Sequence, residues 1–332
     1  MFSLDGGRMK LEGCRVVVTG GAGFLGSHLT EVLLHKECQV TILDNLSNGF
    51  MENISHLLSP DKRVNFVKGD LRDPETCLKV SEDAEVVFHE AAQINPVLAV
   101  ENPTLDFEIN ARGTLNMLEA ARKKDVKKFL FASTNVYANP KYLPIDENHP
   151  IDLLSPYAAS KLSGEAYCIV YNNTYGLKTV RLRYTNIYGP RQRSTKNESG
   201  VITIFIERVL KGIRPVIFGD GEQTRDFIYV SDVVQANVLA AESDKSPGEV
   251  FNVGCSAETS VNTIAHTILK IAKREDLVPE RGLGRAADFR RCVVDISKAR
   301  KMLGFEPKIG LTTGLKRTIE WWKNISKESK ND

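Results

Sequence analysis

Tyr157 and Lys161 are the two residues whose types and spacing first indicate chemistry. They lie in the stretch SPYAASKLSGE, which opens with Ser155 and Pro156. A serine followed by a proline is typical of a helix start, and residues four apart share one face of a helix. A free tyrosine titrates near pH ~10, and a nearby cation lowers that value. The pair is therefore a candidate acid–base dyad; the alternative is two ordinary neighbours on a helix face.

A glycine-rich loop earlier in the chain indicates a bound dinucleotide. The stretch TGGAGFLGSHL follows the apolar run RVVVTG and opens a helical pattern, with glycines three apart at Gly20, Gly23 and Gly26. Such glycines permit a tight turn, close approach to a pyrophosphate and close packing of helix on strand. The free N–H groups of the helix start then face the phosphates. We expect all three glycines to contact the cofactor.

Asp44 ends the next apolar run, 18 residues beyond Gly26. A carboxylate there would accept hydrogen bonds from the adenosine ribose and repel a 2′-phosphate, which favours NAD over NADP. The alternative is an aspartate that only starts the turn DNLSNG.

The elements that must position these residues alternate between short strand-like runs and longer helical patterns. Helical patterns cover residues 110–124 and 156–173. Apolar strands separated by helices predict an α/β fold, a doubly wound parallel sheet covered on both faces. The six expected strands are 15–20, 39–44, 64–70, 85–92, 127–133 and 178–184.

The chain changes character after these strands, and we predict two domains. Residues 14–185 form the dinucleotide-binding (Rossmann) domain, and segments near 225–253 return to its sheet. Residues 186–325 form a smaller α/β lobe that binds the substrate, with helices near 201–211, 261–273 and 311–325 and short strands between them.

Composition excludes several classes of protein. A formal net charge of +2 over 332 residues gives no reason to expect nucleic acid or an anionic membrane as a partner. The six cysteines are scattered without metal-ligand spacing, so we expect reduced thiols and no metal. No run approaches the ~18 apolar residues of a membrane span, and we expect a cytoplasmic protein.

Taken together, the motifs resemble those of the extended short-chain dehydrogenase/reductase family. The likeness covers about residues 14–325 and is greatest to the nucleotide-sugar epimerases of the UDP-glucose 4-epimerase type. The stretches that carry it are TGGAGFLGSH, DNLSNG, GDLRD, HEAAQ, YAASK, RYTNIYGPRQ, GDGEQTRDFIYVSD and RAADFRRC.

The resemblance implies NAD as cofactor and assigns binding roles along the chain. Phe24 and Leu25 would lie against the pyrophosphate. Further cofactor contacts are implied for the adenosine ribose at Asp44, Asn45, Leu46, Ser47, Asn48 and Gly49, for adenine at Asp70 and Leu71, and for the nicotinamide at Ala91, Ala92 and Gln93. The nucleotide diphosphate and its ribose would be held by Asn186, Arg225, Arg285 and Asp288, and guanidinium groups suit phosphate oxygens.

The resemblance also implies a reaction. Tyr157 would take a proton from a sugar hydroxyl while a hydride passes to NAD, and Lys161 would stabilise the phenolate and bind the nicotinamide ribose. The resulting 4-keto sugar would turn over and take the hydride back on its other face. A hydroxyl of Ser133 or Thr134 would orient the sugar. The stretch FASTNVY is one residue short, so alignment from either side selects a different one, and Ser133 is preferred.

Two departures from the family pattern bear on the substrate. Sugar 4,6-dehydratases carry an acidic pair where this chain has Asn135 and Val136, which disfavours elimination of water. Cys292 stands where hexose-specific members have a tyrosine, and we hypothesise that it leaves room for N-acetyl sugars; the alternative is a small packed side chain.

Several other functions stay open at this point. They are a 2-epimerase similar to CDP-paratose 2-epimerase, another nucleotide-sugar epimerase or decarboxylase, a net oxidoreductase, and a non-catalytic NAD sensor or scaffold. The family also suggests a homodimer formed through residues 110–124 and 156–173.

Overall fold

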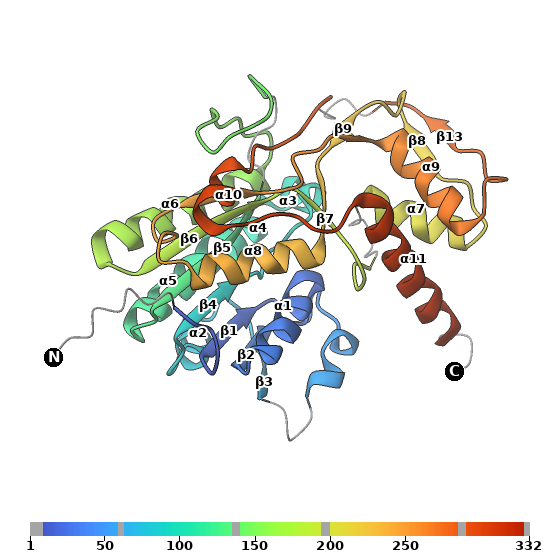
Figure 1. The fold of residues 1–332 in the computed structure, drawn as a ribbon. Helices are drawn as coiled ribbons and strands as arrows, with labels where there is room; N and C mark the ends of the chain where they lie inside the picture. Colours follow the sequence, from blue (N-terminus) through green and yellow to red (C-terminus); the bar gives the residue numbers. More distant parts are fainter. Residues whose placement is uncertain (1–8, 59–62, 135–139, 194–199, 285–289, 329–332) are drawn as a thin grey trace.

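A seven-stranded sheet forms the centre of the computed structural model (Figure 1), which describes residues 9–58, 63–134, 140–193, 200–284 and 290–328. Its strands are β1 (Arg15–Thr19), β2 (Gln39–Asp44), β3 (Val64–Lys68), β4 (Val86–His89), β5 (Lys128–Thr134), β6 (Lys178–Tyr184) and β11 (Val250–Val253). They pair in parallel in the order β11-β6-β5-β4-β1-β2-β3. The predicted doubly wound α/β fold is confirmed.

The strand order reverses between β1 and β4, and ligands of such sheets bind at that point, beyond the carboxyl ends of the strands. β1, β4 and β5 are almost entirely buried, which explains why they read as continuous apolar runs. The loops that follow β1 and β4 carry the glycines and Ala91, and Thr134 is the last residue of β5. The sheet therefore gathers the predicted cofactor and catalytic residues at one edge.

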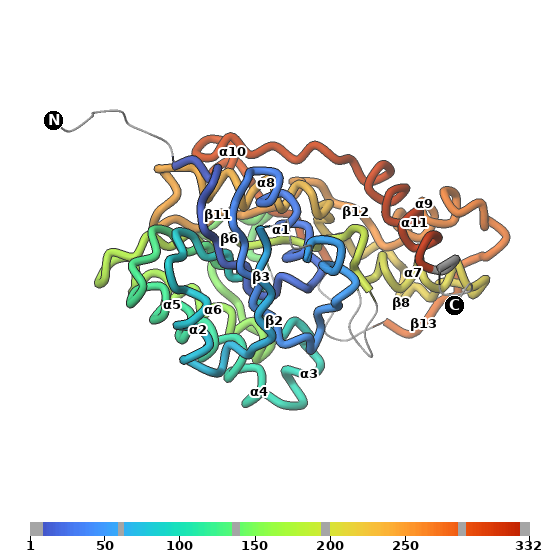
Figure 2. The backbone as a smooth tube through the Cα atoms, turned by 90° about the horizontal axis from the view of Figure 1, so that it is seen from below, coloured from blue at the N-terminus to red at the C-terminus, as the bar shows by residue number. Residues whose placement is uncertain are grey.

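Two layers of helices cover the sheet, as Figure 2 shows from below. One apolar core joins the sheet to α2, α5 and α6, and the other joins it to α1, α8 and α10. The helices of the chain are α1 (Phe24–His35), α2 (Pro74–Val80), α3 (Pro96–Glu101), α4 (Pro103–Phe107), α5 (Gly113–Lys123), α6 (Pro156–Tyr175), α7 (Val201–Leu210), α8 (Val230–Glu242), α9 (Val261–Ala272), α10 (Ser297–Leu303) and α11 (Leu311–Glu328), with the short helical turns η1 (Met51–Asn53), η2 (Ser55–Leu57) and η3 (Glu108–Arg112).

A smaller lobe lies beside the sheet, on the right of Figure 1. Its core is formed mainly by α7, α9 and α11, with the apolar side chains of short strand pairs. These strands are β7 (Asn186–Tyr188), β8 (Val216–Phe218), β9 (Thr224–Arg225), β10 (Phe227–Tyr229), β12 (Thr259–Ser260) and β13 (Glu280–Gly282). β7 pairs with β10, β9 with β12 and β8 with β13.

Parts of the C-terminal half return to the sheet. β11 pairs with β6, and α8 packs on the same face as α1. The return of segments near 225–253 was predicted, although β10 pairs outside the main sheet. The segment from Cys292 to Phe305, including α10, also packs into the core of the sheet. It lies within 186–325, so that range mixes residues of both lobes.

Three local features complete the fold. η3 is a π-helical turn inserted between α4 and α5 where a continuous helix was expected from residue 110. None of the six cysteines, all within the described residues, forms a disulfide. Among the described helices, none is both long and apolar enough to span a membrane.

Candidate active site

The glycine loop between β1 and α1 is shaped by close backbone contacts. Gly20 has a φ of +69°, and a Cβ there would lie 2.9 Å from the backbone of Ala91. A Cβ on Gly26 would lie 2.2 Å from the carbonyl oxygen of Gly20. Gly23 precedes the first residue of α1. The loop therefore leaves the first N–H groups of α1, those of Phe24 and Leu25 among them, facing a cradle that a dinucleotide phosphate fits.

Replacing Gly26 with alanine tests this cradle. The new methyl group would overlap the Gly20 carbonyl oxygen, so the loop must shift, and we expect a stability loss of about 1–3 kcal/mol with most of the bound NAD lost. Thermal unfolding and NAD content after denaturation measure the two effects. Gly310→Ala is the control, because a Cβ at Gly310 meets nothing within 4 Å. Normal NAD content in Gly26→Ala would contradict the assignment of this loop.

Asp44 holds the glycine loop and the turn after β2 together. Its carboxylate accepts hydrogen bonds from the backbone N–H groups of Ala22 (3.0 Å) and Leu46 (2.8 Å). Burial raises its pKa, and these two N–H donors oppose the increase. Each carboxylate oxygen has a further lone pair, so the group can also accept from a ribose. The alternative of a simple turn starter is therefore incomplete, because Asp44 also stabilises the phosphate loop.

The predicted adenosine side is assembled around Asp70. The Asn45 amide donates to the Asp70 carboxylate at 3.0 Å, and Arg72 forms a salt bridge with it at 2.7 Å. The Arg72 guanidinium holds the pKa of Asp70 far below its usual range.

Leu71 is buried against Gly113 at the start of α5. Ser47 is the next residue of the turn, and its N–H donates to Asn45. Asn48 and Gly49 complete this turn, beside Asp44.

The candidate dyad lies at the start of α6. The Ser155 hydroxyl accepts from the N–H of Ala158 at 3.2 Å and Pro156 opens the helix, as predicted. Lys161 is 2% exposed, and its ammonium lies 4.4 Å from the centre of the Phe131 ring of β5. Tyr157 is partly buried one turn earlier. Both side chains therefore turn toward the carboxyl edge of the sheet, which ordinary surface neighbours do not.

The structure separates the two candidate hydroxyls after β5. The Thr134 hydroxyl lies near the phenol of Tyr157, where its interaction opposes the increase in the pKa of Tyr157. Ser133 turns to the other side and donates to the carboxylate of Glu165 at 2.6 Å, and Glu165 forms a buried salt bridge with Arg183 at 2.6 Å. The Ser133 hydroxyl is thus engaged by Glu165, so Thr134 is the hydroxyl that we propose below to orient the sugar; the choice between the two stays a prediction.

Burial controls the protonation of the dyad. It raises the pKa of Tyr157 to about 12, with the Thr134 hydrogen bond opposing the increase. It lowers the pKa of Lys161 to about 8, opposed first by the charge of Glu90. The chain by itself therefore keeps Tyr157 protonated. A cationic nicotinamide beside the phenol would supply the additional stabilisation that a phenolate needs at neutral pH.

A buried network of hydrogen bonds connects α4 and the turn η3 to α6. The amide of Asn110, in the π-helical turn η3, donates to Asp106 (3.0 Å) and to the Ser160 hydroxyl (3.2 Å). The Gln93 amide donates to Asp106 at 2.9 Å and to the carbonyl oxygen of Asn95 at 3.0 Å. The side chain of Gln93, which was expected at the nicotinamide, is therefore turned into the protein. Ala91 and Ala92 lie at the loop surface with intermediate exposure.

Two of the expected substrate residues, Asn186 and Arg225, lie on short strands of the second lobe. Asn186 is exposed on β7, paired with Phe227 of β10, and Arg225 lies two residues before Phe227 on β9. Arg285 and Asp288 lie outside the described residues, as do Asn135 and Val136.

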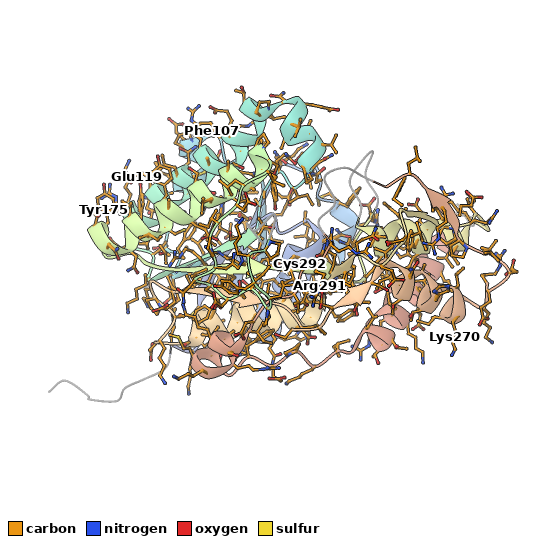
Figure 3. All side chains as sticks on the ribbon, turned by 90° about the horizontal axis from the view of Figure 1, so that it is seen from above. Phe107, Glu119, Tyr175, Lys270, Arg291 and Cys292 are labelled. Carbon is orange, nitrogen blue, oxygen red and sulfur yellow. The ribbon has the colours of Figure 1, made fainter. Side chains whose placement is uncertain are left out.

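Cys292 was expected to face the sugar, but it is 1% exposed and packs in the core of the sheet. Figure 3 shows it beside Arg291, where the sheet layer meets the C-terminal lobe. The volume by which cysteine differs from tyrosine is therefore filled by protein, which agrees with the alternative of a small packed side chain.

Sequence reasoning did not identify the residues that position the dyad. Glu165 lies four residues after Lys161, and Asp106 lies four before Asn110, so helical spacing could have placed each pair on one face. Glu90 is a charged residue within the otherwise apolar run at the end of β4. Only the fold shows that Glu165 pairs with Arg183, and that Glu90 accepts a hydrogen bond from Tyr184.

A parallel sheet with a glycine loop at its switch point and a tyrosine–lysine pair on the helix after β5 defines an extended short-chain dehydrogenase/reductase that uses NAD. Residues 16–254 match the family described as "NAD dependent epimerase/dehydratase family". The chain belongs to this family.

Named relatives are similar over nearly the whole chain. A putative UDP-glucose 4-epimerase of Methanocaldococcus jannaschii is 46% identical over 313 residues, which cover 93% of this chain and 98% of the relative. The crystal structure of the Thermotoga maritima UDP-glucose 4-epimerase with UDP-glucose has a TM-score of 0.88 at 39% identity, covering 94% and 99% of the two chains. A UDP-N-acetylglucosamine 4-epimerase from Methanobrevibacter ruminantium M1, in complex with UDP-N-acetylmuramic acid, has a TM-score of 0.89 at 36% identity, covering 95% and 99%.

Proposed function

We propose that this chain is an epimerase that inverts a UDP-hexose at C4, interconverting UDP-glucose and UDP-galactose. The observation that carries the proposal is the grouping of the Tyr157 phenol, the Thr134 hydroxyl and the buried Lys161 at the edge of the sheet that holds the glycine loop. NAD supplies reversible hydride acceptance when bound. The similarity to UDP-glucose 4-epimerases over nearly the whole chain supports reaction at C4 of a UDP-sugar.

The roles of the residues follow from their positions. Tyr157 would remove the proton of the sugar 4-hydroxyl as the C4–H bond breaks, with bound NAD supplying the hydride acceptor. The Thr134 hydroxyl orients the same oxygen, and the Lys161 charge stabilises the phenolate. Tyr157 would give its proton back to the same oxygen when the 4-keto sugar presents its other face for reduction at C4. Proton and hydride would both return to the sugar, so no net oxidant or reductant would be consumed.

The enzyme must also bind the nucleotide part of the substrate. Asn186 and Arg225, from β7 and β9 of the smaller lobe, are proposed to bind the diphosphate, and the guanidinium suits phosphate oxygens. The resemblance assigns Arg285 and Asp288 to the same nucleotide. We extend the proposal to UDP-N-acetylglucosamine and UDP-N-acetylgalactosamine on the similarity to the Methanobrevibacter ruminantium enzyme. Cys292 does not carry this extension, because it is buried.

Incubation with a panel of UDP- and CDP-sugars tests the function. We expect NMR of the products to show inversion at C4 for UDP-glucose and UDP-galactose, with transient reduction of bound NAD and no release of NADH. Inversion at C2 of a CDP-sugar would replace the proposal with the 2-epimerase alternative. Loss of CO₂ or water would indicate a decarboxylase or dehydratase, and binding of NAD without turnover would indicate a sensor.

The choice of hydroxyl gives a direct prediction. Thr134→Val keeps the side-chain shape and removes the group that contacts Tyr157, so we expect kcat to fall by roughly 10–100-fold. Ser133→Ala removes a hydrogen bond to Glu165 and is expected to cost about 1.5–3 kcal/mol of stability while kcat changes little. Steady-state kinetics and urea unfolding separate the two. The opposite pattern would transfer the catalytic role to Ser133.

We infer that the chain forms a homodimer through its α3, α4 and α6 surface. Val100 is 64% exposed, Phe107 54% and Val170 45%, on helices that pack against one another. Figure 3 shows Phe107 and Tyr175 along this outer side. An apolar surface of this kind is typical of an interface. α5 contributes little, because its apolar residues are buried against the sheet.

Light scattering should give the mass of a dimer for the parent protein, and Val170→Asp should give a folded monomer. A monomeric parent would contradict this inference.

A further inference from the structure

Asp226 is a fully buried carboxylate of the smaller lobe that the proposed reaction does not use. It lies between Arg225 of β9 and Phe227 of β10 and is 0% exposed. Its main-chain carbonyl oxygen accepts a hydrogen bond from the N–H of Asn186 at 3.0 Å. The two residues proposed to bind the diphosphate are thus its neighbour in sequence and its hydrogen-bond partner.

The carboxylate of Asp226 lies in a turn of converging backbone N–H groups. One oxygen accepts from the N–H of Cys255 at 2.8 Å, and the other accepts from the N–H groups of Ser256 at 3.0 Å and Val294 at 3.4 Å. Ser256 has a φ of +53°, and such turns direct successive N–H groups toward one anion. Burial raises the pKa of Asp226 to about 6, and these backbone N–H groups oppose the increase. The group is therefore ionised at neutral pH.

This turn lies where the chain leaves the main sheet for the smaller lobe. The turn follows β11, and β12 after it pairs with β9, which places Thr259 opposite Arg225. β11 itself pairs with β6, and only Thr185 separates β6 from Asn186 of β7. Both connections therefore leave the sheet side by side. The Asp226 carboxylate binds one of them, and its carbonyl oxygen binds the other.

A third segment meets the same carboxylate. Besides the bond from the Val294 N–H, the Ser256 hydroxyl donates to the Val294 carbonyl oxygen at 2.7 Å. A Cβ on Gly254 would lie 2.8 Å from a carboxylate oxygen of Asp226 and 2.7 Å from the Val294 side chain, so these groups are closely packed. Val294 comes shortly after Asp288 in the chain. Asp226 therefore joins the segments that carry or follow every residue expected to bind the nucleotide.

We propose that Asp226 is a positioning residue for the substrate: its carboxylate holds the smaller lobe at the end of the main sheet, so that Arg225 and Asn186 meet the diphosphate while the sugar reaches the dyad. This rests on the proposed function. The glycine loop follows β1, which β6, β5 and β4 separate from β11, so bound NAD should not depend on Asp226. The residue acts on the affinity for the nucleotide and not on the chemistry of the dyad.

Binding of UDP to the NAD-loaded protein, measured by isothermal titration calorimetry, tests this role without turnover. In Asp226→Asn an NH₂ group replaces one carboxylate oxygen and opposes N–H groups that need an acceptor. We expect the Kd for UDP to increase by roughly 10–100-fold, the size of effect of losing a charged hydrogen bond to the diphosphate. KM for the UDP-sugar should rise with it while kcat changes little, and the NAD content should equal that of the parent.

Asp232→Asn is the matched control. Asp232 of α8 is another buried carboxylate, 2% exposed, and it accepts from the backbone N–H of Ile309 at 3.0 Å. Urea unfolding should show a loss of stability in both variants, but only Asp226→Asn should weaken the binding of UDP. Ser256→Ala removes only the hydroxyl that donates to Val294, and this milder second variant should show a smaller increase in the same Kd.

An unchanged Kd in folded Asp226→Asn, or an equal increase in Asp232→Asn, overturns the proposal. Loss of NAD together with UDP also overturns it, because it would show a general disturbance of the fold. If Asp226→Asn does not fold, an unchanged Kd in Ser256→Ala decides against the proposal. A parent that does not bind UDP would contradict the proposed function as well, whereas an unchanged Kd in the variants leaves that function intact, so the two failures are distinguishable.

Discussion

Replacing Tyr157 with phenylalanine should lower kcat by about a thousandfold, the size of effect typical of losing a positioned acid–base group. The ring remains and only the hydroxyl that contacts Thr134 is removed, so the fold and the glycine loop should persist. We therefore expect the variant to retain bound NAD and a near-normal KM. Kinetics with UDP-glucose or UDP-galactose and NAD content of the purified protein measure these quantities.

Tyr175→Phe provides the control for this result. Tyr175 ends the same helix, is 53% exposed and stacks with Arg122 through its ring, so removing its hydroxyl should leave kcat near that of the parent. Full activity in Tyr157→Phe would remove the phenol from the mechanism. Loss of NAD together with activity would instead indicate that the hydroxyl holds the cofactor.

Neutralising Glu165 should cause the largest loss of stability among the single changes considered. Glu165→Gln leaves the Arg183 guanidinium, which is 5% exposed as a residue, without its ionic partner. Breaking such a buried pair typically costs about 3–5 kcal/mol. We expect a decrease of this order in the free energy of unfolding, measured by urea denaturation monitored by circular dichroism.

An exposed ion pair and a double variant serve as controls for the Glu165→Gln result. Glu207 and Lys211 form a surface pair on and just after α7, with the lysine side chain 62% exposed, and Glu207→Gln should cost under about 0.5 kcal/mol. Changing Glu165 to leucine and Arg183 to methionine together removes both charges and should recover much of the loss. A cost for Glu165→Gln as small as that for Glu207→Gln would show that the buried pair contributes little to stability.

Local sequence patterns were sufficient to predict most strands of the sheet, the glycine loop and the start of the helix that carries the dyad. The expected strand at residues 39–44 matches β2, and the helix start at Ser155 was correctly placed. Both depend on residue order within a short window: apolar runs, a capping serine and glycines three apart. The fold then follows from general rules of strand connection.

Contacts between distant segments were not accessible in the same way. Ser133 and Thr134 face different partners because successive residues of a strand point to opposite sides, and a one-residue gap in the alignment left that register open. The pairing of Glu165 with Arg183 requires the packed sheet. The burial of Cys292 depends on the return of the chain to the sheet, which no local pattern marks.

The place of β11 has a consequence for how the protein is made. β6 carries unpaired backbone groups along one side until β11, which comes after much of the smaller lobe, lies against it. While the segment between β6 and β11 is still being translated, the nascent chain therefore exposes β6 as an unprotected edge strand. Unprotected edge strands can pair with other chains and cause aggregation. A truncated fragment ending at residue 185 should aggregate, so the two lobes cannot be expressed as separate modules.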